Sequence, residues 1–141
     1  MRRATGCALA LAGLLGLPAC GEDEDHVNRE RPPASINVTA AIIDGRIDVS
    51  PRKFGAGPIR LLVTNQTASA QAITFETDEV GGDSPGLTQR SSPIDPAGTA
   101  TLEVDVREGR YAISVSGKGV KPATVEVGAQ RPSAQSELLQ P

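Results

Sequence analysis

Apolar and polar residues alternate along much of this chain, and this alternation is the feature that most limits its possible folds. The pattern is clearest where Leu102, Val104 and Val106 alternate with polar residues. A period of two places successive side chains on opposite faces of a strand, one face toward a core and the other toward water. No window has the three- and four-residue apolar spacing of an amphipathic helix without an intervening glycine or proline. The sequence therefore predicts an all-β domain.

The same alternation predicts further strands between residues 34 and 128. Asp44-Gly45 is a hairpin signal between two of them. Residues 50–58 and 78–93 are rich in turn-forming types and are predicted as loops. The residues expected to face inward are Ile36, Val38, Ala40, Ile42, Ile47, Val49, Ile59, Leu61, Val63, Ile73, Phe75, Tyr111, Ile113, Val115, Ala123, Val125 and Val127. Seven or eight strands at this spacing predict a Greek-key antiparallel β-sandwich.

The N-terminal segment has the three-part layout of a secretory signal peptide. A positive start, Met1-Arg2-Arg3, precedes an apolar run over residues 8–17 that is too short to span a bilayer. Leu17-Pro18-Ala19-Cys20 resembles the lipobox of bacterial lipoproteins. The resemblance implies that residues 1–19 are removed and that Cys20 carries a thioether-linked diacylglycerol with acyl chains such as palmitate. A chance cysteine beside an ordinary cleavage site is the alternative.

The lipid would hold the mature chain on a cell membrane, on its extracytoplasmic face. Removing residues 1–19 leaves 122 of the 141 residues and lowers the count of Lys and Arg from 14 to 12 against 17 acids, a net charge near −5. This charge argues against nucleic acid as a partner. Cys7 leaves with the signal, so Cys20 has no partner for an intrachain disulfide.

Polar segments flank the predicted sandwich on both sides. Residues 20–33 contain four consecutive acids and little apolar surface, so we expect a disordered tether, with a cation site including His26 as the alternative. Residues 129–141 are rich in Gln, Ser and Pro and are predicted as a loose tail.

Short motifs at five places resemble the cupredoxin-like family. They are Gly55-x-Gly57-Pro58, a strand ending at Asn65, Pro96-x-Gly98, Glu108-Gly109-Arg110-Tyr111 and a final Val125-Glu126-Val127. The resemblance implies a Greek-key sandwich with copper ligands near Gln71 and within residues 115–118. Those positions hold no histidine, cysteine or methionine, whereas a blue-copper site needs a thiolate and two imidazoles. We therefore expect a cupredoxin-like domain without copper and without another cofactor.

Aromatic residues are few, and each has a structural interpretation. A tyrosine after a glycine turn in a Greek-key sandwich commonly anchors a corner through its hydroxyl, which is the role expected of Tyr111. Phe54 and Phe75 are expected in the core.

The long loop holds the remaining candidate ligands. Glu76, Asp78, Glu79 and Asp83 lie close together in sequence, and paired carboxylates can act in catalysis or bind cations. Acids beside a glycine-rich loop are more often solvated, and their spacing does not match a calcium loop. With no Ser-His-Asp set and no Gly-x-Ser-x-Gly motif, an enzyme is not expected.

These inferences favour a membrane-anchored lipoprotein that acts as a non-catalytic interaction or accessory module, with an envelope protein as partner. The alternative is a protein that binds a small ligand or metal ion through residues 76–93, in copper handling or respiration.

Overall fold

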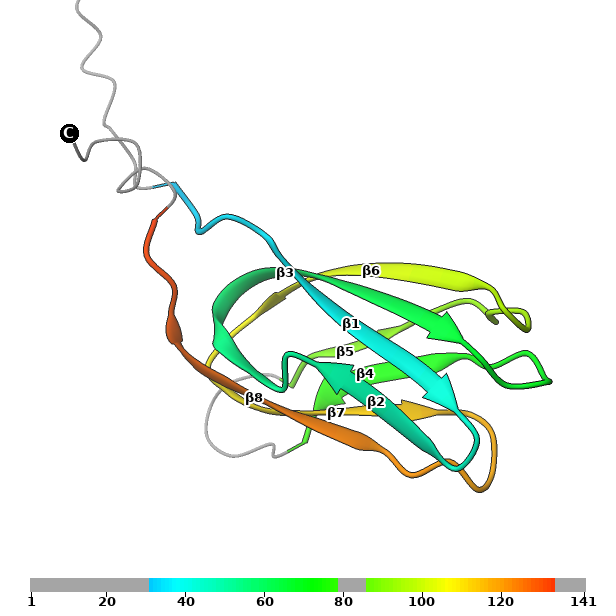
Figure 1. The fold of residues 1–141 in the computed structure, drawn as a ribbon. Helices are drawn as coiled ribbons and strands as arrows, with labels where there is room; N and C mark the ends of the chain where they lie inside the picture. Colours follow the sequence, from blue (N-terminus) through cyan, green and yellow to red (C-terminus); the bar gives the residue numbers. More distant parts are fainter. Residues whose placement is uncertain (1–30, 79–85, 134–141) are drawn as a thin grey trace, which may run out of the picture.

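The computed structural model describes residues 31–78 and 86–133, and the regular structure in these ranges is β-strand throughout (Figure 1). The predicted all-β class and strand number are confirmed. The signal segment and Cys20 lie outside the described residues. The eight strands are β1 (Ile36–Ile43), β2 (Arg46–Ser50), β3 (Lys53–Asn65), β4 (Ile73–Thr77), β5 (Thr88–Arg90), β6 (Thr99–Val106), β7 (Gly109–Val115) and β8 (Ala123–Gln130).

The long strand β3 joins two packed layers (Figure 1). Most of β3 pairs with β1 on one side and β6 on the other, and β2 extends this layer beyond β1. The first residues of β3 pair instead with β8, from which β7, β4 and β5 continue the second layer. The pairing is mixed rather than antiparallel throughout, because β3 is parallel to both β1 and β8. Side-chain alternation is the same in both kinds of pairing and does not encode strand direction.

The segment predicted as a loop over residues 50–58 contains the start of β3, which corrects that prediction. The pairing register with β8 shifts between Gly55 and Ala56, and Gly57 has a φ of +125°. A bulge followed by a glycine in this conformation turns a strand sharply without ending it. The turn-forming residues here carry β3 from one layer into the other.

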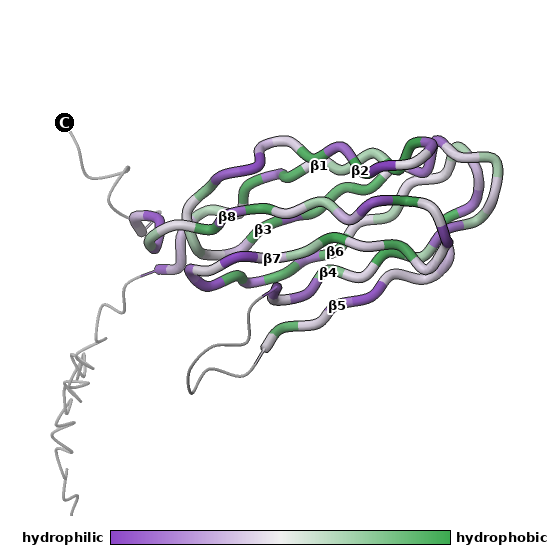
Figure 2. The backbone as a smooth tube through the Cα atoms, turned by 90° about the horizontal axis from the view of Figure 1, so that it is seen from below, coloured by the Kyte–Doolittle hydropathy of each residue, from purple (hydrophilic) through white to green (hydrophobic). Residues whose placement is uncertain are grey.

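The core lies between the layers and contains most of the predicted inward residues, together with Ala56 and Ile94 from segments predicted as loops. Leu61 and Ile113 are fully buried, whereas Leu62, on the opposite face of β3, is 39% exposed. Figure 2 shows hydrophobic and hydrophilic residues alternating along the strands. Phe75 is buried as predicted, but Ile36, Phe54 and Val115 are only partly buried against the core.

Tyr111 anchors the turn that precedes it, as predicted. Its hydroxyl accepts a hydrogen bond from the Arg107 backbone N–H at 3.1 Å and donates one to the Arg107 carbonyl at 3.0 Å. Its ring stacks on Phe75 with 5.1 Å between centroids.

We expect Tyr111→Phe to lower the free energy of unfolding by about 1–2 kcal/mol, because the ring contacts remain while both bonds to Arg107 are lost. For a domain of this size the melting temperature should fall by roughly 5–10 °C, which circular dichroism would measure. An unchanged melting temperature would show that the hydroxyl adds no stability.

Both ends of the described chain leave the sandwich at the same end, which we name the tether end (Figure 1). Pro33, within the predicted tether, is buried, and so is Ser133, within the predicted tail. The strand β8 also continues to Gln130. Ordered structure thus extends beyond residues 34–128 on both sides. The opposite, distal end holds the turn at Gly45, whose carbonyl accepts a hydrogen bond from the Lys121 backbone N–H.

Candidate functional site

The predicted acidic cluster is described only in part. Glu76 is a half-buried residue of β4, and Asp78 is exposed just after that strand. Glu79 and Asp83 lie outside the described residues. The backbone N–H of Asp78 donates to the Arg110 carbonyl at 2.9 Å, which places Asp78 beside a basic residue. In residues 31–78 and 86–133, no three His, Cys, Asp or Glu side chains form a metal-binding group.

The loop carrying these acids is also shorter than predicted. Residues 88–90 form β5, which pairs antiparallel with β4 through Phe75 and its neighbours. This edge strand escaped prediction because its side chains are all exposed and show no inward alternation.

The two segments where the cupredoxin resemblance implies copper ligands come together at the distal end. The backbone N–H and hydroxyl of Ser116 both donate to the Ala72 carbonyl, at 3.0 and 3.1 Å. The Gln71 amide lies over Gly117, where an added Cβ would be 2.6 Å from its Oε1. An amide, a hydroxyl and a glycine thus occupy this position.

Asn65 lies at the same end of the sandwich, and its side chain is fully buried. Its Nδ2 donates to the carbonyls of Ser69 and Ile94, both at 2.8 Å. Its Oδ1 accepts from the backbone N–H and the hydroxyl of Thr67, at 3.0 and 2.7 Å. All the hydrogen-bonding capacity of this side chain is used to join loops, which makes Asn65 a structural residue.

At the tether end the guanidinium of Arg131 binds the backbone of two other segments. Its Nε donates to the carbonyls of Gly55 and Ala56, at 3.1 and 3.2 Å. Its Nη2 donates to the Pro58 carbonyl and its Nη1 to the Ala34 carbonyl. These carbonyls belong to the bend of β3 and to the segment preceding β1. Arg131 therefore fastens both chain ends to the bulge.

A row of charged side chains crosses the outer face of the second layer, close to Arg131. Glu126 of β8 lies between Lys53 of β3 and Arg110 of β7, because the backbone register pairs it with both. The Lys53 Nζ is 2.6 Å from Glu126 Oε2. This hydrogen bond, together with the charges of Lys53 and Arg110, holds the pKa of Glu126 below its usual value. The carboxylate therefore stays ionised and partly neutralises the cations beside it.

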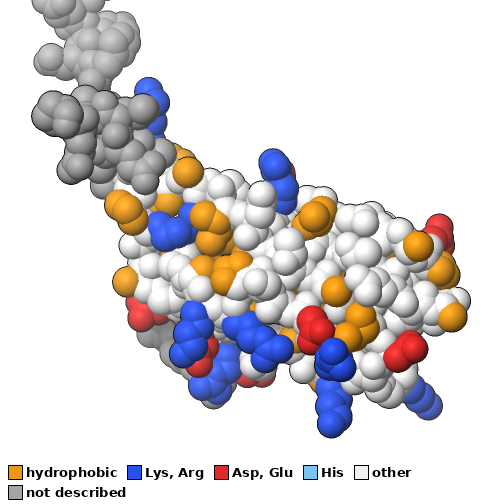
Figure 3. Space-filling view, viewed as in Figure 1, with side chains coloured by type: hydrophobic (Ala, Val, Ile, Leu, Met, Phe, Trp, Pro, Cys, Tyr) orange, Lys and Arg blue, Asp and Glu red, His pale blue; other side chains and the backbone are white. Residues whose placement is uncertain are grey.

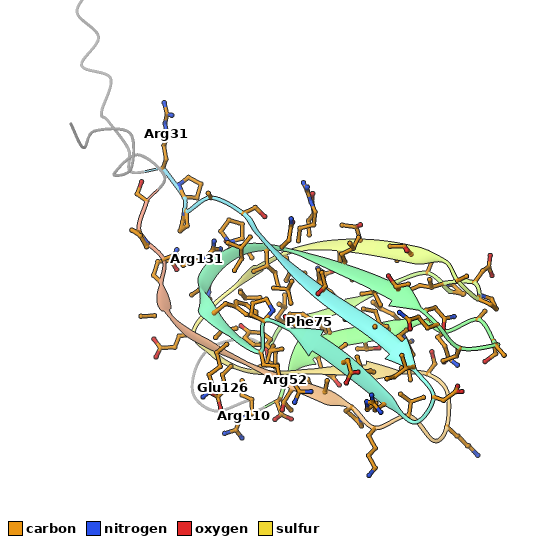
Figure 4. All side chains as sticks on the ribbon, viewed as in Figure 1. Arg31, Arg52, Phe75, Arg110, Glu126 and Arg131 are labelled. Carbon is orange, nitrogen blue, oxygen red and sulfur yellow. The ribbon has the colours of Figure 1, made fainter. Side chains whose placement is uncertain are left out.

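The charged row borders an open hollow of about 640 Å³. Its lining combines the three charged side chains with Phe54, with Val127 and with three glycines, Gly55, Gly109 and Gly128. Arg52 lies beside it, since its carbonyl accepts a hydrogen bond from the Glu126 backbone N–H at 2.8 Å. Figure 4 shows Arg52, Arg110 and Glu126 gathered in one region, and Figure 3 shows Lys and Arg side chains concentrated there.

No protein-family model matches the sequence, and no curated protein matches it either. Among solved structures, the fold is similar to reduced auracyanin from the photosynthetic bacterium Roseiflexus castenholzii, with 13% identity, a TM-score of 0.49, and coverage of 68% of this chain and 98% of that one. It is also similar to the multicopper oxidase mgLAC, with 15% identity, a TM-score of 0.43 and coverage of 75% of this chain. The match spans only 42% of that oxidase. At these identities the likeness is one of fold only.

Proposed function

We propose that this chain is an extracytoplasmic lipoprotein, anchored through Cys20, whose sandwich is a non-catalytic interaction or accessory module. The observation that carries the proposal is the exit of both chain ends from one end of the sandwich (Figure 1). A lipid on Cys20 would direct the tether end toward the bilayer. The distal end, with the loops around Gly45 and Ser116, would then face away and be open to a partner in the cell envelope.

The length of the tether limits how far the sandwich can stand from the membrane. Residues 20–30, which precede the described chain, extend over at most roughly 40 Å. In residues 31–78 and 86–133, no helix has the length and hydropathy to cross a bilayer. The proposal assigns membrane attachment to the acyl chains on Cys20, because two or more such chains hold a protein stably on a bilayer.

The proposal predicts that Cys20→Ser abolishes labelling of the full-length chain by a fatty-acid probe in a bacterial host. The matched control is Cys7→Ser, which removes the other cysteine and should leave labelling unchanged because Cys7 departs with the signal. Persistent labelling of Cys20→Ser, or loss of labelling in the Cys7 variant alone, would contradict the assignment.

A further inference from the structure

The strand β6 runs along one edge of the first layer, with one side open (Figure 1). Within residues 31–78 and 86–133 it pairs with β3 alone, over eight consecutive residue pairs without a bulge. The other two edge strands, β2 and β5, have five and three residues. Proline, lysine or a bulge commonly protects such an edge, and β6 contains none of these. The open side of β6 can therefore accept another strand.

The pairing with β3 identifies the backbone groups of β6 that face outward. Asn65 and Gly98 continue this register, and the Asn65 N–H donates to the Gly98 carbonyl at 2.9 Å. In an antiparallel ladder, hydrogen-bonded and non-hydrogen-bonded pairs alternate. The even-numbered residues of β6 thus bond to β3, whereas the odd-numbered residues direct their N–H and C=O groups to the open side. These outward residues are Thr99, Thr101, Glu103 and Asp105.

The run of outward groups has a defined limit at each end. The next odd-numbered residue is Arg107, but its backbone N–H and C=O are both bonded to the Tyr111 hydroxyl, at 3.1 and 3.0 Å. At the other end the chain has turned away by Ala97, whose N–H donates to the Asn65 carbonyl. A pairing strand therefore meets four outward residues and no more.

We propose that β6 pairs antiparallel with β6 of a second copy of this chain, with the twofold axis at Leu102. In this register Thr99 lies opposite Asp105 of the second copy, and Thr101 lies opposite Glu103 of the second copy. All four outward residues of each copy then exchange hydrogen bonds in both directions. The four residues are self-complementary, which is why a second copy fits this edge.

Charge and register select this arrangement from its neighbours. Like charges directly opposite each other destabilise a sheet, and here each carboxylate faces a threonine. The two Glu103 side chains are diagonal neighbours, and Arg60 Nη2 of the same copy lies 3.1 Å from each carboxylate. A shift by two residues one way sets Glu103 opposite Glu103 and needs the groups of Arg107 that are already bonded. The opposite shift leaves Asp105 without a partner.

The pairing joins the first layers of two copies and covers the core along this edge. Leu102 is 8% exposed, whereas Leu61, its partner on β3, is fully buried. Because the strands are antiparallel, the two tether ends lie at opposite ends of the pair. An anchored pair would lie along the bilayer, within reach of two tethers of at most roughly 40 Å, whereas a single copy stands with its distal end outward. Anchoring to one surface would raise the effective concentration of the copies for each other.

The test uses the processed chain, residues 20–141 with Cys20→Ser, in which Leu102→Cys supplies the single thiol. At the axis the two copies of residue 102 form a non-hydrogen-bonded pair with Cα atoms about 4.5 Å apart, which suits a disulfide. Ala100→Cys is the matched control, because its two copies would lie roughly 13 Å apart along the strands. Under mild oxidation we expect Leu102→Cys to form a linked dimer at least about tenfold faster than Ala100→Cys. Equal rates, or no linked dimer, overturn the proposal. If Leu102→Cys misfolds, T101C/E103C takes its place on the exposed face.

A backbone variant tests the outward groups without a thiol. Thr101→Pro removes an N–H that β6 does not donate to β3, and proline is tolerated at such edge positions. In sedimentation velocity we expect the processed chain to form a reversible dimer as its concentration rises. Thr101→Pro should weaken this dimer by roughly tenfold or more, since one hydrogen bond is lost in each copy. Thr101→Val keeps the N–H and should dimerise like the parent.

Three results would overturn the proposal without affecting the result for Cys20 labelling. The first is a processed chain that stays monomeric at its highest soluble concentration. The second is equal weakening by Thr101→Pro and Thr101→Val. The third is a monomer in which the N–H groups of Thr101 and Glu103 are protected from hydrogen exchange, because another segment would then cover the edge.

Discussion

Val104→Asp should unfold the sandwich at ambient temperature. Val104 is 6% exposed and pairs with Ile59 in the centre of β6 and β3. A carboxylate placed there has no cationic partner in the apolar core, and burying an unpaired charge costs several kcal/mol. A domain of this kind has a total stability of about 5–15 kcal/mol, so most of it would be lost. Circular dichroism and chemical denaturation would measure the change.

Thr101→Asp is the matched control, since it introduces the same side chain on the exposed face of the same strand. We expect it to change the free energy of unfolding by less than about 1 kcal/mol, as surface substitutions usually do. Similar losses from the two variants would show that the assignment of inner and outer faces of β6 is incorrect.

Arg131→Met should lower the free energy of unfolding by about 3 kcal/mol, the second largest effect we expect. The substitution keeps an unbranched apolar stem but removes every guanidinium bond to the bend of β3 and to Ala34. Hydrogen bonds to a charged group contribute about 1.5–3 kcal/mol each, although the Ala56 carbonyl keeps its hydrogen bond from the backbone N–H of residue 131. Hydrogen exchange should become faster around Gly55–Pro58 and near Ala34.

Two further variants serve as comparisons for Arg131→Met. Arg60→Met removes an exposed arginine whose ion pair with Glu103 measures 3.1 Å, and exposed pairs contribute about 1 kcal/mol or less. Arg131→Lys keeps the charge but not the forked donors and should fall between wild type and Arg131→Met. If Arg60→Met and Arg131→Met destabilise equally, Arg131 has no special role at the tether end.

The strands with regular alternation were predictable, because side-chain period and burial follow from the same physics. The inward row of β6 is as predicted, and so are Tyr111 and Ile113 of β7 and the hydroxyl anchor of Tyr111. The start of β3 was not predictable in this way, since Gly55 and Gly57 suggest a turn by composition. Pairing with β8 and, from Gly57 onward, with β6 makes that segment a strand, and both partners are distant in sequence.

The candidate site could not be found from the sequence for a related reason. Lys53, Arg110 and Glu126 are brought together by the registers of three strands, and no local motif connects them. Arg131 lies in a stretch whose Gln, Ser and Pro content indicates a loose tail, yet its side chain binds backbone carbonyls more than seventy residues away in sequence. The sequence feature that could have indicated this role of Arg131 is a single arginine just after the last strand.

Mass spectrometry of the N-terminal peptide, from full-length chain expressed in a bacterium and extracted from its membranes with detergent, would measure signal removal and lipid attachment together. We expect Cys20 to be the first residue and its peptide to carry the mass of a diacylglyceryl group. A chain that retains Met1, or a peptide in which Cys20 has a free thiol, would show that this chain is not a lipoprotein anchored through Cys20.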